Sequence, residues 1–396
     1  MATVTPPAAE SLRSDPLLAW RSEFPSAERF THLLNHSLGA MPRRARARTA
    51  EYLDTWDERN IHAWEEVWWS LPIEVGNVLA DILHAPHGSV TLHPNATLAQ
   101  ATVLSALEFK GTRNRIVCTE LDFPSMLYLY EGLADRGAQV VRVRSTDGVT
   151  VDPVRIVEAI DEKTAVVAIS AIFFKTAALI DVAPVVARAH AVGAPVLLDA
   201  YQWIGAVPID VTSLGVDFLA GGSVKYLCGG PGAGFLYVRP DLLAGLRPRL
   251  TGWFAHEDPL AFDPGPMRYR DDGLKLLSGT PHVVCLYAAR AGYEIVREVG
   301  VEAIREKSMR LTTRIVEFAL AEGWTLRSPR EASKRGGSVT IDVPGGEEVR
   351  NELFRRDVLC DYRPGAGIRL GPHFYTSEDD VERALAEIKS IVAARR

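Results

Sequence analysis

The chain has few cysteines, and none lies in a pattern that binds metal or builds a disulfide framework. The four are far apart in the sequence, with no CxxC pair, at Cys118, Cys228, Cys285 and Cys360. His32 and His36 have i,i+4 spacing, but no HExxH glutamate accompanies them. The sequence therefore predicts no metal site, and we interpret Cys228 as a packing residue.

Long apolar runs and an excess of basic residues are also lacking. No stretch approaches the roughly 18 apolar residues that cross a bilayer, and residues 1–16 lack the apolar core of a signal peptide. The 44 basic and 50 acidic residues are mixed along the chain and give a net charge of −6. We therefore expect a cytoplasmic protein that binds neither nucleic acids nor membranes.

Motifs of two large enzyme classes are missing as well. The chain has no GxSxG of serine hydrolases, and no lysine stands in a Walker motif. A glycine-rich stretch at 229–234 is followed by an apolar strand rather than a helix, which argues against a dinucleotide site. We expect these glycines to let the backbone pass close to a cofactor.

Between about residues 88 and 240, short β-rich runs alternate with helical periods such as 98–108 and 184–192. The expected strands are 89–93, 115–119, 139–144, 165–174, 195–199, 218–221 and 234–238. This alternation predicts a mostly parallel α/β sheet covered by helices on both faces, in which the last two strands form an antiparallel hairpin.

The flanking regions differ in character. We expect a flexible tail over residues 1–25, and a large domain over 26–260 that begins with a tryptophan-rich helical arm. A smaller α+β domain is expected over 261–396. It would contain a long helical stretch at 283–322, two short strands and a closing helix capped by Ser377.

Two residues between 195 and 238 suggest the chemistry. Asp199 ends an apolar run, and Lys225 lies 26 residues later, between a second apolar run and the glycine-rich turn. A pyridoxal phosphate enzyme needs such a lysine to hold the cofactor as a Schiff base. It also needs an acid that pairs with the ring nitrogen, so that the ring can accept electrons. A lysine at a strand end that faces water is the alternative.

Three further positions have both a functional and a structural interpretation. Backbone N–H groups of Ala96 and Thr97 could hold a phosphate at a helix start, or Asn95 could simply cap that helix. Phe123 could stack on a planar ring or pack in the core. Arg369 could clamp a carboxylate or face water from an edge strand.

Taken together, these residues resemble kynureninases and, more broadly, the class V aminotransferase family of fold-type-I pyridoxal phosphate enzymes. The resemblance extends from about residue 30 to the C-terminus and rests on many separate motifs. Among them are Asn35-His36-Ser37-Leu38-Gly39-Ala40-Met41-Pro42, Asp122-Phe123-Pro124, Lys225-Tyr226-Leu227, Gly252-Trp253-Phe254, Gly279-Thr280-Pro281 and Cys360-Asp361-Tyr362-Arg363.

The resemblance implies pyridoxal 5'-phosphate as cofactor, a large sheet domain with a smaller α+β domain, and an obligate homodimer with shared active sites. Lys225 and Asp199 would be catalytic. The implied cofactor contacts are Ala96, Thr97, Phe123, Asp199, Gln202, Ser223 and Lys225, together with Trp253 and Thr280, which would reach the neighbouring subunit's site. The implied substrate contacts are Arg369, Trp64, Asn35 and Phe254.

The implied reaction is cleavage of the Cβ–Cγ bond of an α-amino acid, through an aldimine with Lys225 and a quinonoid. The chain departs from kynureninases at Val224, where they have a tyrosine that takes part in acid–base chemistry, and Lys175 is another departure. C–S β-lyase activity on a cysteine conjugate, transamination and epimerisation therefore stay open. An inactive cofactor-binding paralogue is the alternative from another class.

Overall fold

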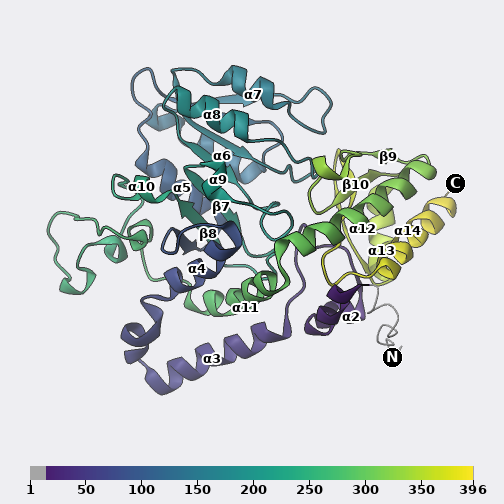
Figure 1. Cartoon of the computed structure of the whole chain (residues 1–396), viewed down its shortest axis with the longest axis horizontal. Coiled ribbons are helices and arrows are strands. Elements are labelled where there is room, and N and C mark those ends of the chain that lie inside the picture. Colours follow the sequence, from purple (N-terminus) through teal and green to yellow (C-terminus); the bar gives the residue numbers. More distant parts are fainter. Residues whose placement is uncertain (1–14, 396) are drawn as a thin grey trace.

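A computed structural model describes residues 15–395, and its largest element is a seven-stranded sheet (Figure 1). The strands lie in the order β2-β8-β7-β6-β5-β3-β4. Their bounds are β2 (Val90–His93), β3 (Arg115–Thr119), β4 (Gln139–Val143), β5 (Thr164–Ser170), β6 (Val196–Asp199), β7 (Phe218–Gly222) and β8 (Gly234–Val238). Only β8 runs antiparallel to its neighbours. The predicted mostly parallel sheet and its terminal hairpin are confirmed.

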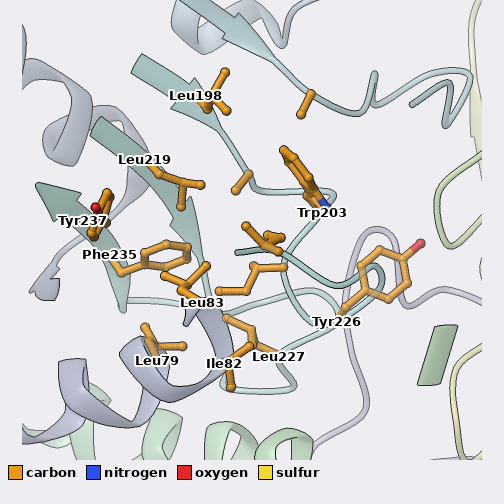
Figure 2. Close-up of a cluster of buried hydrophobic side chains, with 14 of the residues drawn as sticks. Leu79, Ile82, Leu83, Leu198, Trp203, Leu219, Tyr226, Leu227, Phe235 and Tyr237 are labelled. Atoms are coloured by element: carbon orange, nitrogen blue, oxygen red, sulfur yellow. The ribbon is translucent and has the colours of Figure 1, made fainter. Parts of the chain in front are cut away.

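Helices cover both faces of this sheet, because its central strands are apolar on both sides. Leu197 of β6 belongs to the same core as α5 (Ala96–Ala106) and α6 (Pro124–Glu131), whereas Leu198 belongs to the core that includes α4 (Leu71–Leu83), α8 (Ala183–Ala191) and α11 (Val283–Val299). Figure 2 shows the second face, where Leu79 and Leu83 of α4 approach Leu219 and Phe235. Side chains alternate across a strand, so Asp199 points to the same face as Leu197. That is the face covered by α5.

Helices of the N-terminal and central regions connect and flank these strands. They are η1 (Pro16–Glu23), α2 (Pro25–Arg29), α3 (Arg43–Arg59), the π-helical turn η2 (Trp64–Trp68), α4 (Leu71–Leu83), α5 (Ala96–Ala106), α6 (Pro124–Glu131), η3 (Ala134–Arg136), α7 (Pro153–Ala159), α8 (Ala183–Ala191), α9 (Val211–Leu214), α10 (Pro240–Leu243), η4 (Trp253–Ala255), η5 (Pro259–Ala261) and η6 (Gly273–Leu276). Between residues 15 and 395, no helix is both long and apolar enough to cross a bilayer.

The C-terminal region forms a second, antiparallel sheet in the order β12-β13-β10-β9. Its elements are α11 (Val283–Val299), α12 (Val301–Ala321), β9 (Thr325–Leu326), η7 (Ala332–Lys334), β10 (Val339–Asp342), α13 (Gly346–Arg355), β11 (Val358–Leu359), β12 (Asp361–Arg363), β13 (Gly367–Leu370) and α14 (Glu378–Ala393). Ser377 and Asp380 form the predicted cap of α14. Strand β1 (Thr31–His32) pairs with β11, so the N-terminal segment is attached to this region.

The large sheet has a hydrophobic core on each face, and the C-terminal sheet has a core of its own. Along helix α12, residues as far as Ile304 belong to a core of the large sheet, and residues from Leu311 onward belong to the core of the C-terminal sheet. The predicted domain boundary near residue 260 stays a prediction, since the cores divide further along the chain, within α12. Figure 1 shows α11 beneath the large sheet, beside α3 and α4, while α12 leads to the smaller sheet.

Part of the predicted flexible tail is folded. Residues 1–14 lie outside the described residues, but 15–25 pack on the C-terminal region. Phe24 is fully buried and its ring stacks on Tyr375 with centroids 4.1 Å apart. Arg21 forms an ion pair with Asp380 at 2.5 Å. The tail prediction is wrong for this part, because composition alone does not reveal these distant partners.

Replacing Phe24 by alanine should therefore destabilise the protein by about 3–5 kcal/mol, the usual cost of deleting a buried aromatic ring. Urea denaturation would measure the change. Phe354→Ala is the matched control, because Phe354 is 40% exposed, and it should cost less than about 1 kcal/mol. Equal effects of the two substitutions would contradict the packing of residues 15–25.

Candidate active site

A cavity of about 320 Å³ lies where β6 and β7 end, between the large sheet and β13. Asp199 is the last residue of β6, and Lys225 follows β7 by three residues. These strands are parallel neighbours, so their carboxyl ends meet at one edge of the sheet, where ligands bind in open α/β folds. The predicted site residues that line the cavity are Ala96, Thr97, Phe123, Asp199, Gln202, Lys225 and Arg369.

Lys225 projects its amine into this cavity beside two aromatic rings. Its Nζ lies 4.2 Å from the ring centroid of Tyr201 and 5.8 Å from that of Phe123. Burial lowers the pKa of Lys225 to about 7; the charge of Asp199 opposes this shift and that of Arg369 adds to it. Burial therefore favours the neutral amine, which is the form that attacks an aldehyde.

Asp199 offers one free carboxylate oxygen to the cavity. Its Oδ1 accepts the backbone N–H of Tyr201 at 2.8 Å, whereas Oδ2 has no hydrogen-bond partner among residues 15–395. Burial raises the pKa of Asp199, and the Tyr201 N–H and the charge of Lys225 counteract the rise. A cationic ring nitrogen would satisfy this oxygen, so the position fits a protonated pyridine ring.

The start of α5 presents unpaired backbone donors to the same cavity. The Asn95 side chain accepts the N–H of Leu98 at 2.9 Å, so Asn95 is the helix cap. Within the described chain, the N–H groups of Ala96 and Thr97 have no acceptor, as expected for a first helical turn. The capping interpretation is confirmed, and the open N–H groups still fit a phosphate.

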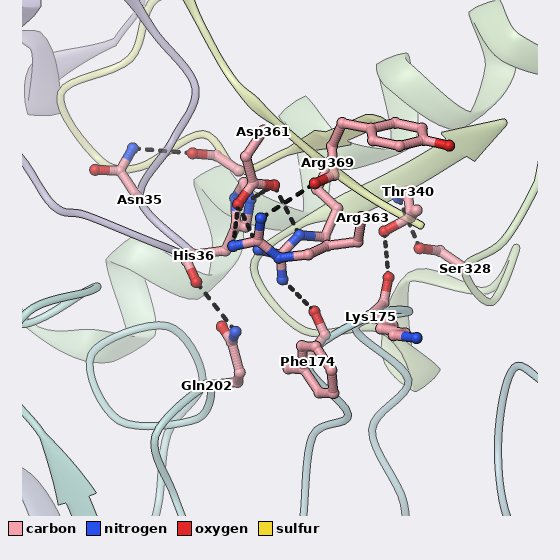
Figure 3. Close-up of polar contacts among 12 residues, drawn as sticks. Asn35, His36, Phe174, Lys175, Gln202, Ser328, Thr340, Asp361, Arg363 and Arg369 are labelled. Carbon is pink, nitrogen blue, oxygen red and sulfur yellow. Dashed lines mark hydrogen bonds and ion pairs between the residues drawn. The ribbon is translucent and has the colours of Figure 1, made fainter. Parts of the chain in front are cut away.

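Beside the cavity, a buried carboxylate holds three cationic or polar side chains (Figure 3). Asp361 and Arg369 face each other across β12 and β13, and Arg369 Nε donates to Asp361 Oδ1 at 2.8 Å. His36 Nε2 lies 3.0 Å from Oδ1, and Arg363 Nη2 lies 2.9 Å from Oδ2. Burial lowers the pKa of His36 to about 4, so the neutral ring donates its Nε2 proton.

Arg369 keeps one edge of its guanidinium free. It is 2% exposed, its Nε and Nη2 donate to Asp361, and its Nη1 donates to the Phe174 carbonyl. A guanidinium has five N–H groups, so one on Nη1 and one on Nη2 remain. These N–H groups can donate to a carboxylate that enters the cavity. Of the two interpretations of Arg369, this buried position favours the carboxylate clamp over a charge that faces water.

Two predicted contact residues lie behind the cavity wall instead. Asn35 is fully buried; its amide donates to the Gly371 carbonyl at 2.9 Å and its oxygen accepts from the Tyr375 hydroxyl. The Ser223 hydroxyl contacts the Ala233 carbonyl and the Tyr293 hydroxyl. These polar groups already have protein partners. The predicted substrate contact of Asn35 and cofactor contact of Ser223 stay predictions.

The four remaining predicted residues, three of them aromatic, do not line this cavity. Trp64 packs edge-on against Trp68 with centroids 5.3 Å apart, and Phe254 is fully buried and stacks on Trp69 at 4.2 Å. Trp253 is 40% exposed, and Thr280 is exposed. Trp64 and Phe254 therefore do not line the cavity of their own chain, because neighbouring indoles hold their rings. The roles of Trp253 and Thr280 in a second subunit stay predictions.

The glycine-rich turn does not line the cavity either. At Gly232, whose φ is +93°, a Cβ would lie 2.6 Å from the Cys285 sulfur of α11. At Gly234 it would lie 2.4 Å from the Asn95 carbonyl carbon. The expectation that these glycines approach a cofactor is therefore wrong for this cavity: they let the turn pack against α11 and α5.

The residues noted as departures also have clear positions. The Val224 carbonyl accepts the N–H of Gly39 at 2.8 Å, which fixes the N-terminal segment beside Lys225. Lys175 Nζ lies 3.4 Å from the Pro364 carbonyl and does not line the cavity. Cys228 is buried beside the Tyr375 hydroxyl, and burial raises the pKa of its thiol to about 12.

Sequence reasoning assigned no role to three cavity residues: Tyr201, Arg363 and His36. Period-two alternation along β12 would have placed Arg363 on the same face as Asp361. Tyr201 follows the end of β6 by two residues, a position where strand periodicity no longer applies. His36 reaches the site through the pairing of the N-terminal segment with β11 and β13, a contact that no local pattern reveals.

Comparison with known proteins shows the family of this chain. The sequence model of the family "Aminotransferase class-V" matches residues 47–381. A kynureninase of Pseudomonas fluorescens is 33% identical over 393 residues, covering 96% of this chain and 93% of the relative. A kynureninase of Bacillus anthracis is 30% identical over 403 residues, with 97% and 94% covered.

Among solved structures, the apo cysteine desulfurase of Thermococcus onnurineus NA1 has a TM-score of 0.84 at 20% identity, with 100% of both chains covered. A mutant of C-DES with glycine covalently linked to its PLP cofactor has a TM-score of 0.85 at 18% identity, covering 93% of this chain and 98% of the other.

The fold is that of the fold-type-I pyridoxal phosphate enzymes, with a mostly parallel central sheet and flanking helices. Within this class, the chain belongs to the class V aminotransferase family and is a pyridoxal-phosphate-dependent enzyme. The free Asp199 oxygen, the Lys225 amine and the open N–H groups of α5 fit this cofactor.

Replacing Asp361 by asparagine should destabilise the protein by about 3–5 kcal/mol, because two arginines would remain beside the cavity without a carboxylate. Burial raises the pKa of Asp361, but the hydrogen bonds from His36 and Arg369 and the charge of Arg369 outweigh it and hold this pKa well below its usual range. Its contribution is therefore present above the unfolded pKa of about 3.9 and is lost as the pH falls below it. Denaturation of wild type and variant at several pH values would measure both effects.

Asp342→Asn is the matched control, because Asp342 pairs with Arg327 at the surface of the same sheet, at 3.2 Å. An exposed pair of this kind contributes about 0–1 kcal/mol. A stability difference between wild type and Asp361→Asn that is equally large at pH 3 and pH 7 would contradict the assigned role of Asp361.

Proposed function

We propose that this enzyme cleaves the Cβ–Cγ bond of an α-amino acid side chain, the reaction for which its kynureninase relatives are named. One observation carries the proposal: the Lys225 amine, the free Asp199 oxygen and the free edge of Arg369 face one cavity of about 320 Å³. A reaction of this class needs covalent attachment of the cofactor, a partner for its charged ring nitrogen and a site for the substrate's α-carboxylate. Lys225, Asp199 and Arg369 meet these three needs in that order.

Pyridoxal phosphate, when bound, supplies a ring that accepts the electrons of a bond broken next to the amino-acid nitrogen. Lys225 would hold its aldehyde, Asp199 its ring nitrogen, and the N–H groups of Ala96 and Thr97 its phosphate. Phe123 and Gln202 would contact the ring. Gln202 Nε2 donates to the His36 carbonyl at 3.1 Å, which fixes its amide at the cavity wall.

Protein groups then bind and orient the substrate. The free Nη1–Nη2 edge of Arg369 takes the α-carboxylate, and Asp361 keeps that edge turned to the cavity. Lys225 would be the base that moves the Cα proton, and its pKa of about 7 suits proton transfer at neutral pH. Phe123 and Phe174, in edge-to-face contact at 5.0 Å, offer an apolar wall to a planar side chain.

We further propose a homodimer with shared active sites. Trp253 is 40% exposed and Phe262 is 74% exposed, and their rings stack with centroids 6.0 Å apart. Exposed aromatic pairs favour association, because burial removes apolar surface from water. Thr280, exposed on a nearby loop, would join Trp253 in the partner's site.

Replacing Lys225 by alanine should abolish covalent attachment of the cofactor, because no other amine lines the cavity among residues 15–395. Borohydride reduction followed by mass spectrometry of the peptide that contains residue 225 would measure attachment. In the wild type, the attachment rate should rise with pH through about 7 and then level, as the amine loses its proton.

Lys175→Ala is the control, since Lys175 lies outside the cavity, and it should retain the attached cofactor. Reducible attachment that persists in Lys225→Ala would refute the assignment of this lysine.

The reaction itself is tested by incubating the holoenzyme with L-kynurenine, a cysteine S-conjugate and common α-amino acids, and identifying products by mass spectrometry. Alanine and an aromatic acid from kynurenine are expected. Pyruvate and a thiol would instead indicate C–S β-elimination. Formation of the keto acid of the substrate would indicate transamination, and loss of optical activity would indicate epimerisation. No reaction with any substrate would indicate an inactive paralogue.

A further inference from the structure

A phenol that has no role in the chemistry above, Tyr201, lies beside the reactive lysine. Its ring lines the cavity, with the centroid 4.2 Å from Lys225 Nζ. Its backbone N–H donates to Asp199 Oδ1 at 2.8 Å, so the turn that carries the phenol is fixed by the acid at the end of β6. Tyr201 therefore touches one of the reacting atoms of the site.

The position of the phenol depends on a glycine in the neighbouring strand. At Gly222, the last residue of β7, a Cβ would lie 2.4 Å from Cζ and 2.5 Å from Oη of Tyr201. Real Cβ atoms do not approach other atoms so closely, so any side chain at position 222 would displace the ring. The hydroxyl end of Tyr201 thus rests on the backbone of Gly222.

The hydroxyl itself is available for proton transfer. It has no hydrogen-bond partner in the part of the chain that the structure describes, residues 15–395. Burial, with a contribution from the charge of Asp199, raises the pKa of Tyr201 to about 12, so the phenol keeps its proton at neutral pH. The other aromatic acid–base group of the cavity, His36, is bound to Asp361 at 3.0 Å.

We propose that Tyr201 is a catalytic residue that delivers a proton to the substrate side chain as it is cleaved. The proposal deepens the proposed function and rests on it. A water molecule adds its hydroxyl to Cγ, and the electron pair of the Cβ–Cγ bond stays with Cβ. The Tyr201 hydroxyl gives its proton to Cβ, and the phenolate regains a proton from the water. Lys225 exchanges the proton at Cα and Tyr201 supplies the proton at Cβ, so a different residue carries out each transfer.

Tyr201→Phe separates this role from packing, because it keeps the ring on Gly222 and removes only the hydroxyl. We expect kcat for side-chain cleavage to fall about 100-fold, with KM changed less than about threefold. Exchange of the Cα proton in heavy water, followed by NMR, should continue at the wild-type rate, since Lys225 is intact. A kcat within threefold of wild type, or equal losses of cleavage and exchange, would overturn the proposal.

Tyr128→Phe is the matched control, because Tyr128 is a phenol on the surface of α6 that is 69% exposed. It should leave kcat, KM and proton exchange unchanged. Gly222→Ala provides a second variant that keeps the hydroxyl but displaces it, and it should lower kcat while Cα exchange persists. Wild-type turnover in Gly222→Ala would argue against a fixed hydroxyl.

A binding measurement tests Tyr201 independently of the reaction. 3-Benzoylpropionate has the ketone and carboxylate of a kynurenine-type substrate but no amine, so it can bind the holoenzyme without reacting. Isothermal titration should show about fivefold weaker binding to Tyr201→Phe, from the loss of one hydrogen bond. If the wild type cleaves no kynurenine-type substrate, the proposed function fails, whereas equal affinities of wild type and variant would overturn the role of Tyr201.

Discussion

A single buried carboxylate, Asp361, joins the three regions that build the site. It binds Arg369 and Arg363 of the C-terminal sheet and His36 of the N-terminal segment. Arg369 in turn donates to the Phe174 carbonyl of the large sheet region. Charges removed from water are stable only when paired, so the position of each region is coupled to the others. The geometry that leaves one edge of Arg369 free for a carboxylate is a consequence of this pairing.

The sequence predicts well those parts of the site that local rules control. A parallel sheet brings the carboxyl ends of neighbouring strands together, so Asp199 at the end of β6 and Lys225 just after β7 had to share an edge. The cap at Asn95 is a local signal of the same kind, and so is the cap at Ser377. In each case the partner lies on an adjacent strand or within one helical turn.

The sequence indicates less where a distant partner decides the position of a side chain. The amide of Asn35 is occupied by Gly371 and Tyr375, more than 300 positions away, and Phe24 is buried by the same Tyr375. Gly232 and Gly234 allow the turn to pack closely against α11 and α5. The residues next to them in the sequence do not indicate this contact. Motif similarity identified the right segments, but it could not state which side chains of each segment face the cavity.

The distribution of proton-transfer groups explains how one cavity can direct the outcome of a reaction. Lys225, with a pKa of about 7, can exchange protons near neutral pH, whereas Tyr201, with a pKa of about 12, can only donate. Burial keeps His36 neutral, and its ring is bound to Asp361 at 3.0 Å, so this ring does not compete. Reactions at Cα need only the lysine, but cleavage of a side chain needs a second proton at Cβ. Val224 carries no acid, and the phenol resting on Gly222, with its ring centroid 4.2 Å from the Lys225 amine, is the group to which we assign that proton.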